Sequence, residues 1–176
     1  MNRPQFLTFT AAQSEQISEI NGDQQRNLRR RGLLSGAAGG WNAYSIDDVA
    51  RLVVVGFLSR RGMPPKIASK IAKKVAPMLV ANALNLKGAI EGGDEDARNE
   101  LRQTWTPPDG LKRFAIATGQ FSTQVGFGND LKKIFFASSE LGGAVVAIDL
   151  KFCALKIVEG AKPLPLVKVL PKDEAA

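Results

Sequence analysis

Residues 26–74 read RNLRRRGLLSGAAGGWNAYSIDDVARLVVVGFLSRRGMPPKIASKIAKK, and this stretch decides the predicted fold. Its pattern indicates a short basic helix, a glycine-rich hairpin and two amphipathic basic helices, in that order. The order is typical of a winged helix-turn-helix. A cationic helix beside a cationic hairpin fits the grooves and phosphates of duplex DNA, so the stretch predicts nucleic-acid binding.

The residues around this stretch define its helices. Thr10 is expected to cap a helix that continues to about Glu19, and Asn21-Gly22 indicates a turn. The basic helix is predicted over 23–31 and stops at Gly32, a natural residue for the end of a helix. Leu33 and Leu34 are expected to begin the first strand of the wing, with the return strand at 41–44.

Two longer helices are predicted after the wing. Ser45 begins a capping-box pattern, and the helix that it caps continues to about Arg61. Pro64 and Pro65 permit a second helix start. The apolar spacing of three and four residues predicts the buried positions of both helices, which are Val49, Leu52, Val53, Phe57, Leu58, Ile67, Ile71, Val75, Met78 and Leu79.

Composition and charge narrow the classes of function. The chain has 176 residues, 44% of them hydrophobic, no histidine and one cysteine, Cys153. This excludes an internal disulfide, a His/Cys metal cage and any mechanism with a histidine base. Residues 1–89 hold 13 Lys/Arg against 5 Asp/Glu, whereas residues 90–176 hold 11 against 12. The asymmetry predicts a basic nucleic-acid-binding half and a neutral half with another task.

We expect an α+β protein with a DNA-binding domain at 1–90, a linker at 91–110 and a small β-rich dimerisation or effector domain at 111–176. The runs RFAIAT, FSTQVGF, LKKIFFA and GGAVVAIDL predict strands. KFCALKIVEG fits a strand or a short helix, and the proline-broken end KPLPLVKVLPKDEAA is expected to form an edge segment or a tail. Cys153 is expected to be a buried apolar residue rather than a nucleophile.

The N-terminal motifs resemble the DNA-binding domain of the MerR family and of excisionase-like phage regulators over residues 7–75. The matching segments are Arg26, Gly32-Leu33-Leu34, Gly40-Trp41-Asn42-Ala43-Tyr44, Asp48-Val49-Ala50-Arg51-Leu52 and Gly62-Met63-Pro64-Pro65-Lys66-Ile67. Asn27, Leu28, Arg29 and Asn42 depart from the family pattern. The resemblance implies a winged helix-turn-helix regulator of transcription.

The predicted basic helix supplies most candidate DNA contacts. Gln24, Gln25 and Asn27 are expected to read base edges in the major groove, since such amides pair with adenine. Arg29, Arg30 and Arg31 are expected to straddle phosphates, and the resemblance adds Arg26. The alternative is that these polar residues form an ordinary solvated surface.

The wing and the following helix supply the remaining candidates. Gly40 allows close approach to a phosphate, and Trp41 and Asn42 are placed against the backbone or the minor groove. Trp41 packing on the next helix is an equal alternative. Tyr44 is a candidate core residue as well as a phosphate contact, and Arg51 is either a phosphate contact or half of an ion pair. Arg60 and the lysines at 66–74 extend the basic surface.

The predicted partner is double-stranded DNA, bound by a homodimer or an array of copies in the cytoplasm at the nucleoid. We expect no cofactor, metal, membrane association or enzymatic activity, and leave a small-molecule effector open. Two alternatives remain: an excisionase-like protein that bends DNA, and a scaffold whose basic half docks an acidic protein.

Overall fold

The computed structural model describes residues 3–34, 43–118, 123–133 and 145–171 of the chain. It is an α+β fold, as predicted. The principal helices are α1 (Ala11–Ser18), α2 (Gly22–Arg30), α3 (Ile46–Ser59), α4 (Pro65–Leu84), α5 (Glu95–Trp105) and α7 (Leu150–Ala161). The strands are β1 (Arg3–Phe6), β2 (Phe9–Thr10), β3 (Ala43–Tyr44), β4 (Ile90–Gly92), β5 (Phe114–Thr118), β6 (Val125–Gly128), β7 (Val145–Asp149) and β8 (Val167–Leu170).

Side-chain caps begin the helices of the N-terminal half where the sequence predicts them. The hydroxyl of Thr10 accepts a hydrogen bond from the Gln13 amide at 3.2 Å, and Ser45 caps α3 in the same way through the Asp48 amide at 3.1 Å. Asn21 caps α2, and Gly32 follows its end with φ near +65°. These contacts satisfy donors that a helix start leaves unpaired, so the predicted helix limits at Thr10, Ser45 and Gly32 are confirmed.

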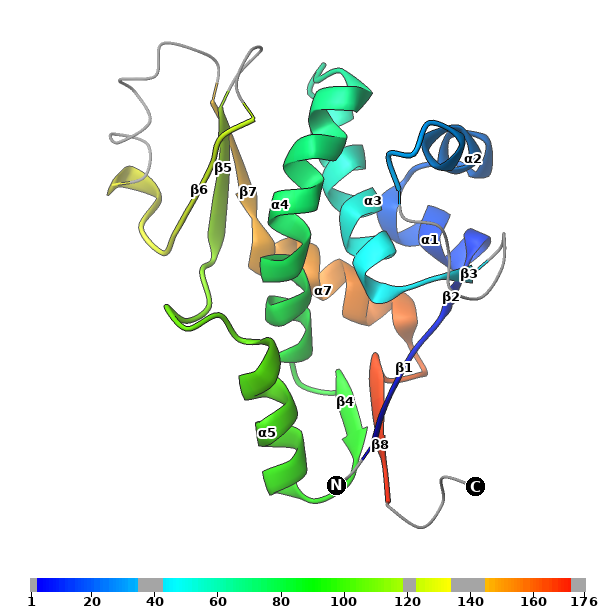
Figure 1. The fold of residues 1–176 in the computed structure, drawn as a ribbon, viewed down its shortest axis with the longest axis vertical. Coiled ribbons are helices and arrows are strands. Elements are labelled where there is room, and N and C mark those ends of the chain that lie inside the picture. Colours follow the sequence, from blue (N-terminus) through cyan, green and yellow to red (C-terminus); the bar gives the residue numbers. More distant parts are fainter. Residues whose placement is uncertain (1–2, 35–42, 119–122, 134–144, 172–176) are drawn as a thin grey trace.

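The long helices α3 and α4 pack against each other and carry the core. Nearly all of their predicted inward positions are buried, while Phe57 and Ile67 are partly buried. Figure 1 shows α4 beside α3 at the centre of the molecule, with α1 and α2 to one side and the β6–β5–β7 sheet to the other. The remaining helices and sheets are therefore arranged around this pair.

The described part of the predicted wing differs from the expectation. Leu33 and Leu34 do not form a strand, because the Leu33 amide donates to the Leu28 carbonyl at 2.9 Å and Leu34 turns into the core with 5% exposure. The return strand is present as β3, but it pairs with β2, with Phe9 opposite Tyr44. The hairpin tip at 35–40 lies outside the described residues.

The two ends of the chain meet in one sheet. Strand β8 lies between β1, with which it is antiparallel, and β4, with which it is parallel. The proline-broken end was expected to be an edge or tail, yet its segment VKVL is the central strand. Prolines at 163, 165 and 171 flank this segment and leave its own N–H groups available for pairing.

One hydrophobic core crosses the expected domain boundary. The segment KFCALKIVEG, which the sequence left open between strand and helix, lies in α7, which packs against α1 and α4. Most of the expected linker 91–110 is the helix α5, which contacts α4 and β4. Residues from 9 to 169 share the same buried cluster, so the described structure does not separate into the two expected domains.

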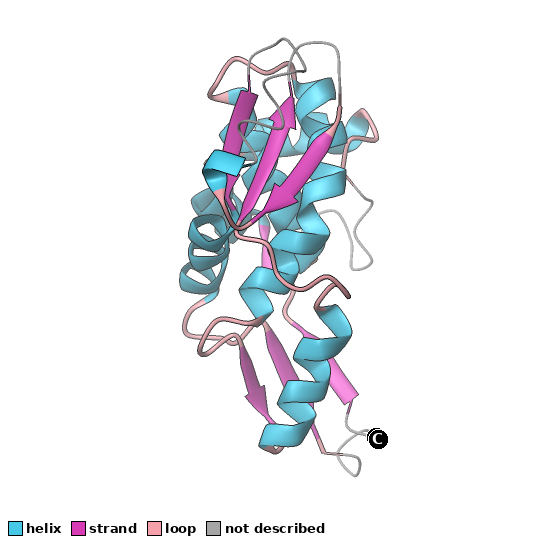
Figure 2. Cartoon of the chain, turned by 90° about the vertical axis from the view of Figure 1, so that its left-hand side faces the viewer, coloured by secondary structure: helices cyan, strands magenta, loops and turns pink. Residues whose placement is uncertain are grey.

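The third sheet has the order β6–β5–β7 and is antiparallel throughout, with Ile116 between Gly126 and Ala147. Figure 2 shows its strands in front of the helices. The strands predicted from RFAIAT, FSTQVGF and GGAVVAIDL are confirmed in β5, β6 and β7. Of the strand predicted from LKKIFFA, residues 131–133 are helical and the others lie outside the described residues.

Candidate nucleic-acid interface

Helix α2 is held against α1 by its inward face. Gln25 is fully buried, and its side-chain amide donates to the Ile20 carbonyl at 2.7 Å and to the Ala11 carbonyl at 3.3 Å. Leu28 is buried beside it with 7% exposure. The prediction that Gln25 reads bases is therefore wrong. Its side-chain amide instead supplies hydrogen bonds to backbone carbonyls of α1 and of the turn between the two helices, which are shielded from water.

The opposite face of α2 is exposed and polar. Arg26, Asn27 and Arg30 are exposed, and they lie on the side away from Gln25 and Leu28 because residues three and four apart share a helix face. Arg26 also pairs with Asp23 one turn earlier. Three of the predicted contact residues therefore lie together on one outward-facing stripe.

Gln24 is exposed at the edge of this stripe and has a second role. The Gln24 side-chain oxygen accepts a hydrogen bond from the backbone N–H of Asn21 at 3.3 Å. In return, the backbone N–H of Gln24 donates to the side-chain oxygen of Asn21 at 2.9 Å. This reciprocal capping box fixes the first turn of α2. Gln24 can therefore meet a partner only at the start of the helix, next to the cap.

Arg29 and Tyr44 join α2 to β3 instead of facing outward. The Arg29 guanidinium donates to the Ala43 carbonyl at 2.7 Å and lies 3.7 Å from the centre of the Tyr44 ring. Tyr44 is 2% exposed, and burial raises the pKa of its hydroxyl. The prediction of Tyr44 as a DNA contact is wrong, and Arg29 is part of the same internal junction.

Arg51 and Arg60 are held in ion pairs. Arg51 pairs with Asp47 at 2.6 Å, so the ion-pair alternative is present in the structure. Burial raises the pKa of Asp47, and the Arg51 charge acts in the opposite direction. Arg60 pairs with Glu19 at 3.1 Å and donates to the Ser18 carbonyl at 3.4 Å. Arg51 thus forms an ion pair within α3, and Arg60 links the end of α3 to the end of α1.

Other cations of the basic half have no acidic partner among the described residues. Arg30 and Arg31 at the end of α2 belong to this group, as do Lys66, Lys70 and Lys73 on the exposed face of α4. Lys74 donates to the Thr123 carbonyl at 2.7 Å. Exposed cations therefore lie both on the outward stripe and end of α2 and on the exposed side of α4.

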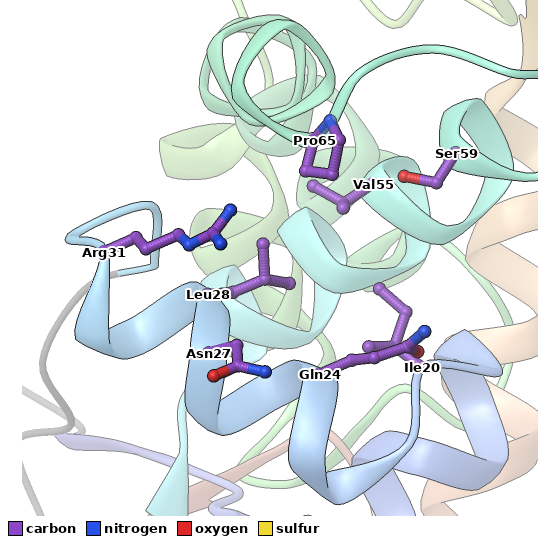
Figure 3. A pocket seen from close by; sticks show the side chains of 8 residues that line it. All are labelled: Ile20, Gln24, Asn27, Leu28, Arg31, Val55, Ser59 and Pro65. Carbon is purple, nitrogen blue, oxygen red and sulfur yellow. The ribbon is translucent and has the colours of Figure 1, made fainter.

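The end of α2 lies close to the start of α4. A cavity of about 220 Å³ lies between them and is closed on its third side by α3 (Figure 3). It brings Arg31 and Leu28 of α2 to the same space as Val55 and Pro65. The sequence offers no signal for this cavity, since its residues come from separate helices and follow no motif.

Three of the predicted contact residues fall outside the described structure. Gly40, Trp41 and Asn42 lie outside the described residues. Within the residues that are described, no cluster of candidate metal ligands occurs. Among those same residues, no helix combines the length and apolar character that crossing a bilayer requires. Cys153 is buried, and burial raises the pKa of its thiol to about 11.

No family model matches the chain, and no curated protein matches its sequence.

Proposed function

We propose that this protein binds double-stranded DNA through α2 and acts as a sequence-specific regulator of transcription of the MerR-like type. The observation that carries the proposal is the division of α2 into two faces. Gln25 and Leu28 anchor the helix, while Arg26, Asn27 and Arg30 project from the opposite side. A short cationic helix held on one side only is the arrangement by which helix-turn-helix proteins enter the major groove.

The dimensions and chemistry of α2 suit that groove. An α-helix with its side chains is about 10–12 Å across and fits the major groove of B-DNA, which is about 12 Å wide, and the nine residues of α2 extend about 14 Å along their axis. Arginine pairs with two acceptors of guanine, and asparagine pairs with adenine. Arg26, Asn27 and Arg30 are therefore the proposed readers of bases, with Gln24 at the leading edge.

Phosphate contacts are assigned to the cations that have no acidic partner in the described structure. Arg31 flanks the reading stripe, and Lys66 and Lys70 follow on the first turns of α4. If six to eight phosphates are neutralised, log affinity should fall with log salt at a slope of about −5 to −7. One helix is a small footprint, so specificity requires a dimer or several copies on adjacent sites.

The proposal is tested by selecting bound DNA from a random duplex pool and measuring affinity for the winning site. The full chain is used, because β8 pairs with β1 and a fragment of 1–90 would lose that strand. Arg30→Gln should weaken binding about tenfold or more and relax the selected sequence at one position. A salt slope shallower than about −2 contradicts the proposal.

Lys87→Gln is the matched control for Arg30→Gln. Lys87 is exposed and lies beyond the far end of α4, about 30 Å from Pro65 along a helix of twenty residues. It removes the same charge away from α2, so its affinity should stay within about twofold of the native protein. Equal losses in the two variants would mean that net charge, rather than α2, drives binding.

Failure of unrelated duplex DNA to displace an acidic partner protein would favour the docking-scaffold alternative.

A further inference from the structure

The cavity beside α2 has an apolar interior. Ile20, Leu28, Val55 and Pro65 contribute its hydrocarbon walls. Figure 3 shows Leu28 of α2 and Val55 of α3 pointing toward each other across it, with Pro65 above Val55. These side chains come from α2, α3, α4 and the turn before α2, so the cavity is a gap where helices fail to meet.

Polar groups lie only at the edge of this cavity. Gln24, Asn27 and Ser59 contribute amide and hydroxyl groups, and Arg31 contributes the one charge of its lining. In Figure 3 the Arg31 guanidinium extends from the end of α2 toward Pro65. Among the described residues it has no acidic partner. An unpaired cation at the mouth of an apolar cavity is complementary to a molecule with an apolar body and a negative end.

We propose that this cavity binds a small amphipathic anion, namely a carboxylate attached to a compact apolar or aromatic body. The size supports this class of ligand: an apolar cavity of about 150 Å³ in another protein accepts benzene. The present cavity, about 220 Å³, holds a single ring and a short arm. The ring packs between Leu28 and Val55, and the carboxylate pairs with Arg31 through charge-assisted hydrogen bonds.

The apolar walls distinguish this ligand from a phosphate or a purely polar anion. Either would lose hydration against Leu28 and Val55 without gaining a hydrogen bond there. The cavity also lies between α2, α3 and α4, so a bound ligand adds contacts to a helix that is otherwise anchored mainly by Gln25, Leu28 and Arg29. Binding should therefore raise the thermal stability of the protein, and the gain should grow with the logarithm of ligand concentration above Kd.

A regulatory consequence rests on the proposed function. Arg31, Asn27 and Gln24 line the cavity and also belong to the predicted DNA-binding surface. A carboxylate on Arg31 neutralises one phosphate contact, so ligand and DNA should weaken each other's binding by the same factor. The ligand site would thus make α2 responsive to a small molecule.

Phenylacetate and its uncharged analogue phenylacetamide are the probes for this site. Titration of the isotope-labelled full chain, followed by backbone amide NMR signals, should show saturable shifts at the end of α2, at Val55 and at Ser59. Phenylacetate should bind at least about tenfold more tightly than phenylacetamide, because only the carboxylate forms a charge-assisted pair. No DNA is present, so this result is independent of the proposed function.

Three variants decide the outcome. Arg31→Gln should abolish the preference for phenylacetate, whereas Arg30→Gln, the adjacent arginine outside the cavity lining, should preserve it. Ser59→Trp places a large ring at the mouth and should block both probes; Ser59 is exposed, so the change spares the core. Absence of saturable phenylacetate binding, equal affinities for the two probes, or equal effects of Arg31→Gln and Arg30→Gln would overturn the proposal.

Discussion

Helices α2 and α7 contrast in how they meet the rest of the molecule. Helix α2 buries two side chains, Gln25 and Leu28, and one of these is polar. Helix α7 is only three residues longer but buries Leu150, Cys153, Ala154, Ile157, Val158 and Ala161 against α1, α3 and α4. The difference shows that α7 contributes much of the packing of the fold, whereas α2 contributes little and leaves most of its surface exposed.

The two helices also differ in how closely they approach their neighbours. At Gly160 of α7, an added Cβ would lie 2.2 Å from Ile17 of α1. Beside α2 the helices stay far enough apart to leave the cavity near Leu28. Close-packed contacts resist any change of volume, whereas a cavity leaves room for a ligand. Each experiment below tests whether the two helices differ in this way, beginning with the largest expected effect.

The inward face of α7 should be closed to reagents. Burial raises the pKa of the Cys153 thiol to about 11, so at pH 8 about one thiol in a thousand is ionised. A disulfide reagent should therefore label the native protein at least about a hundredfold more slowly than the denatured protein. Labelling followed by absorbance in buffer and in guanidinium measures this ratio. Equal rates would mean that α7 does not pack as described.

Gly160→Ala should destabilise the protein by about 1–3 kcal/mol, because the new methyl group overlaps Ile17 and forces α7 away from α1. Urea unfolding followed by circular dichroism measures the change in the free energy of unfolding. Gly126→Ala is the control, since nothing lies within 4 Å of a Cβ added there. A loss as large in the control would remove the close contact between α1 and α7 as the cause.

Gln25→Ala should reduce the free energy of unfolding by about 1–2 kcal/mol, because the Ile20 and Ala11 carbonyls lose a buried donor. The neighbouring Gln24→Ala removes an exposed capping side chain and should cost only a few tenths of a kcal/mol. Thermal melts of the two variants give the comparison. Similar melting temperatures would mean that Gln25 does not anchor α2.

Glu19 connects the two regions through exposed ion pairs with Lys156 of α7 at 2.5 Å and Arg60 at 3.1 Å. The Lys156 hydrogen bond, followed by the Arg60 charge, lowers the pKa of Glu19. A lowered pKa in the folded state means that the stabilisation is present above the ordinary pKa, near 4.5, and is lost as pH falls below it. Solvent screening keeps the gain small, about 0.2–1 kcal/mol.

Glu19→Gln should therefore be slightly less stable than the native protein at pH 7, and the difference should shrink as the pH is lowered from 7 to 3. High salt should shrink the difference at pH 7. Chemical unfolding at the two pH values measures both effects. Glu91→Gln, an exposed change in β4, controls for the loss of one negative charge. A stability difference of the same size at pH 7 and pH 3 would show that the ion pairs are not its source.

Local signals in the chain predicted local structure well. Thr10, Ser45 and Gly32 mark helix limits because capping and positive φ depend on the residue and its immediate neighbours. The spacing of apolar residues in α3 and α4 predicted their buried faces, since a helix repeats its surface every three to four residues. The candidate site was predicted in part: Arg26, Asn27 and Arg30 are exposed together, whereas Gln25 and Tyr44 are buried.

The residues alone specified the cationic N-terminal half, the positions of its helices and the polar character of α2. Contacts between distant segments specified the rest: β8 joins β1 and β4, α7 packs beside α1, and Gln25 turns inward to reach Ala11 and Ile20. A glutamine side chain can form hydrogen bonds with water or with buried carbonyls. Whether it is exposed or buried therefore depends on which residues lie next to it in the folded structure. A cavity likewise exists only once separate helices have met, because no single segment contains its walls.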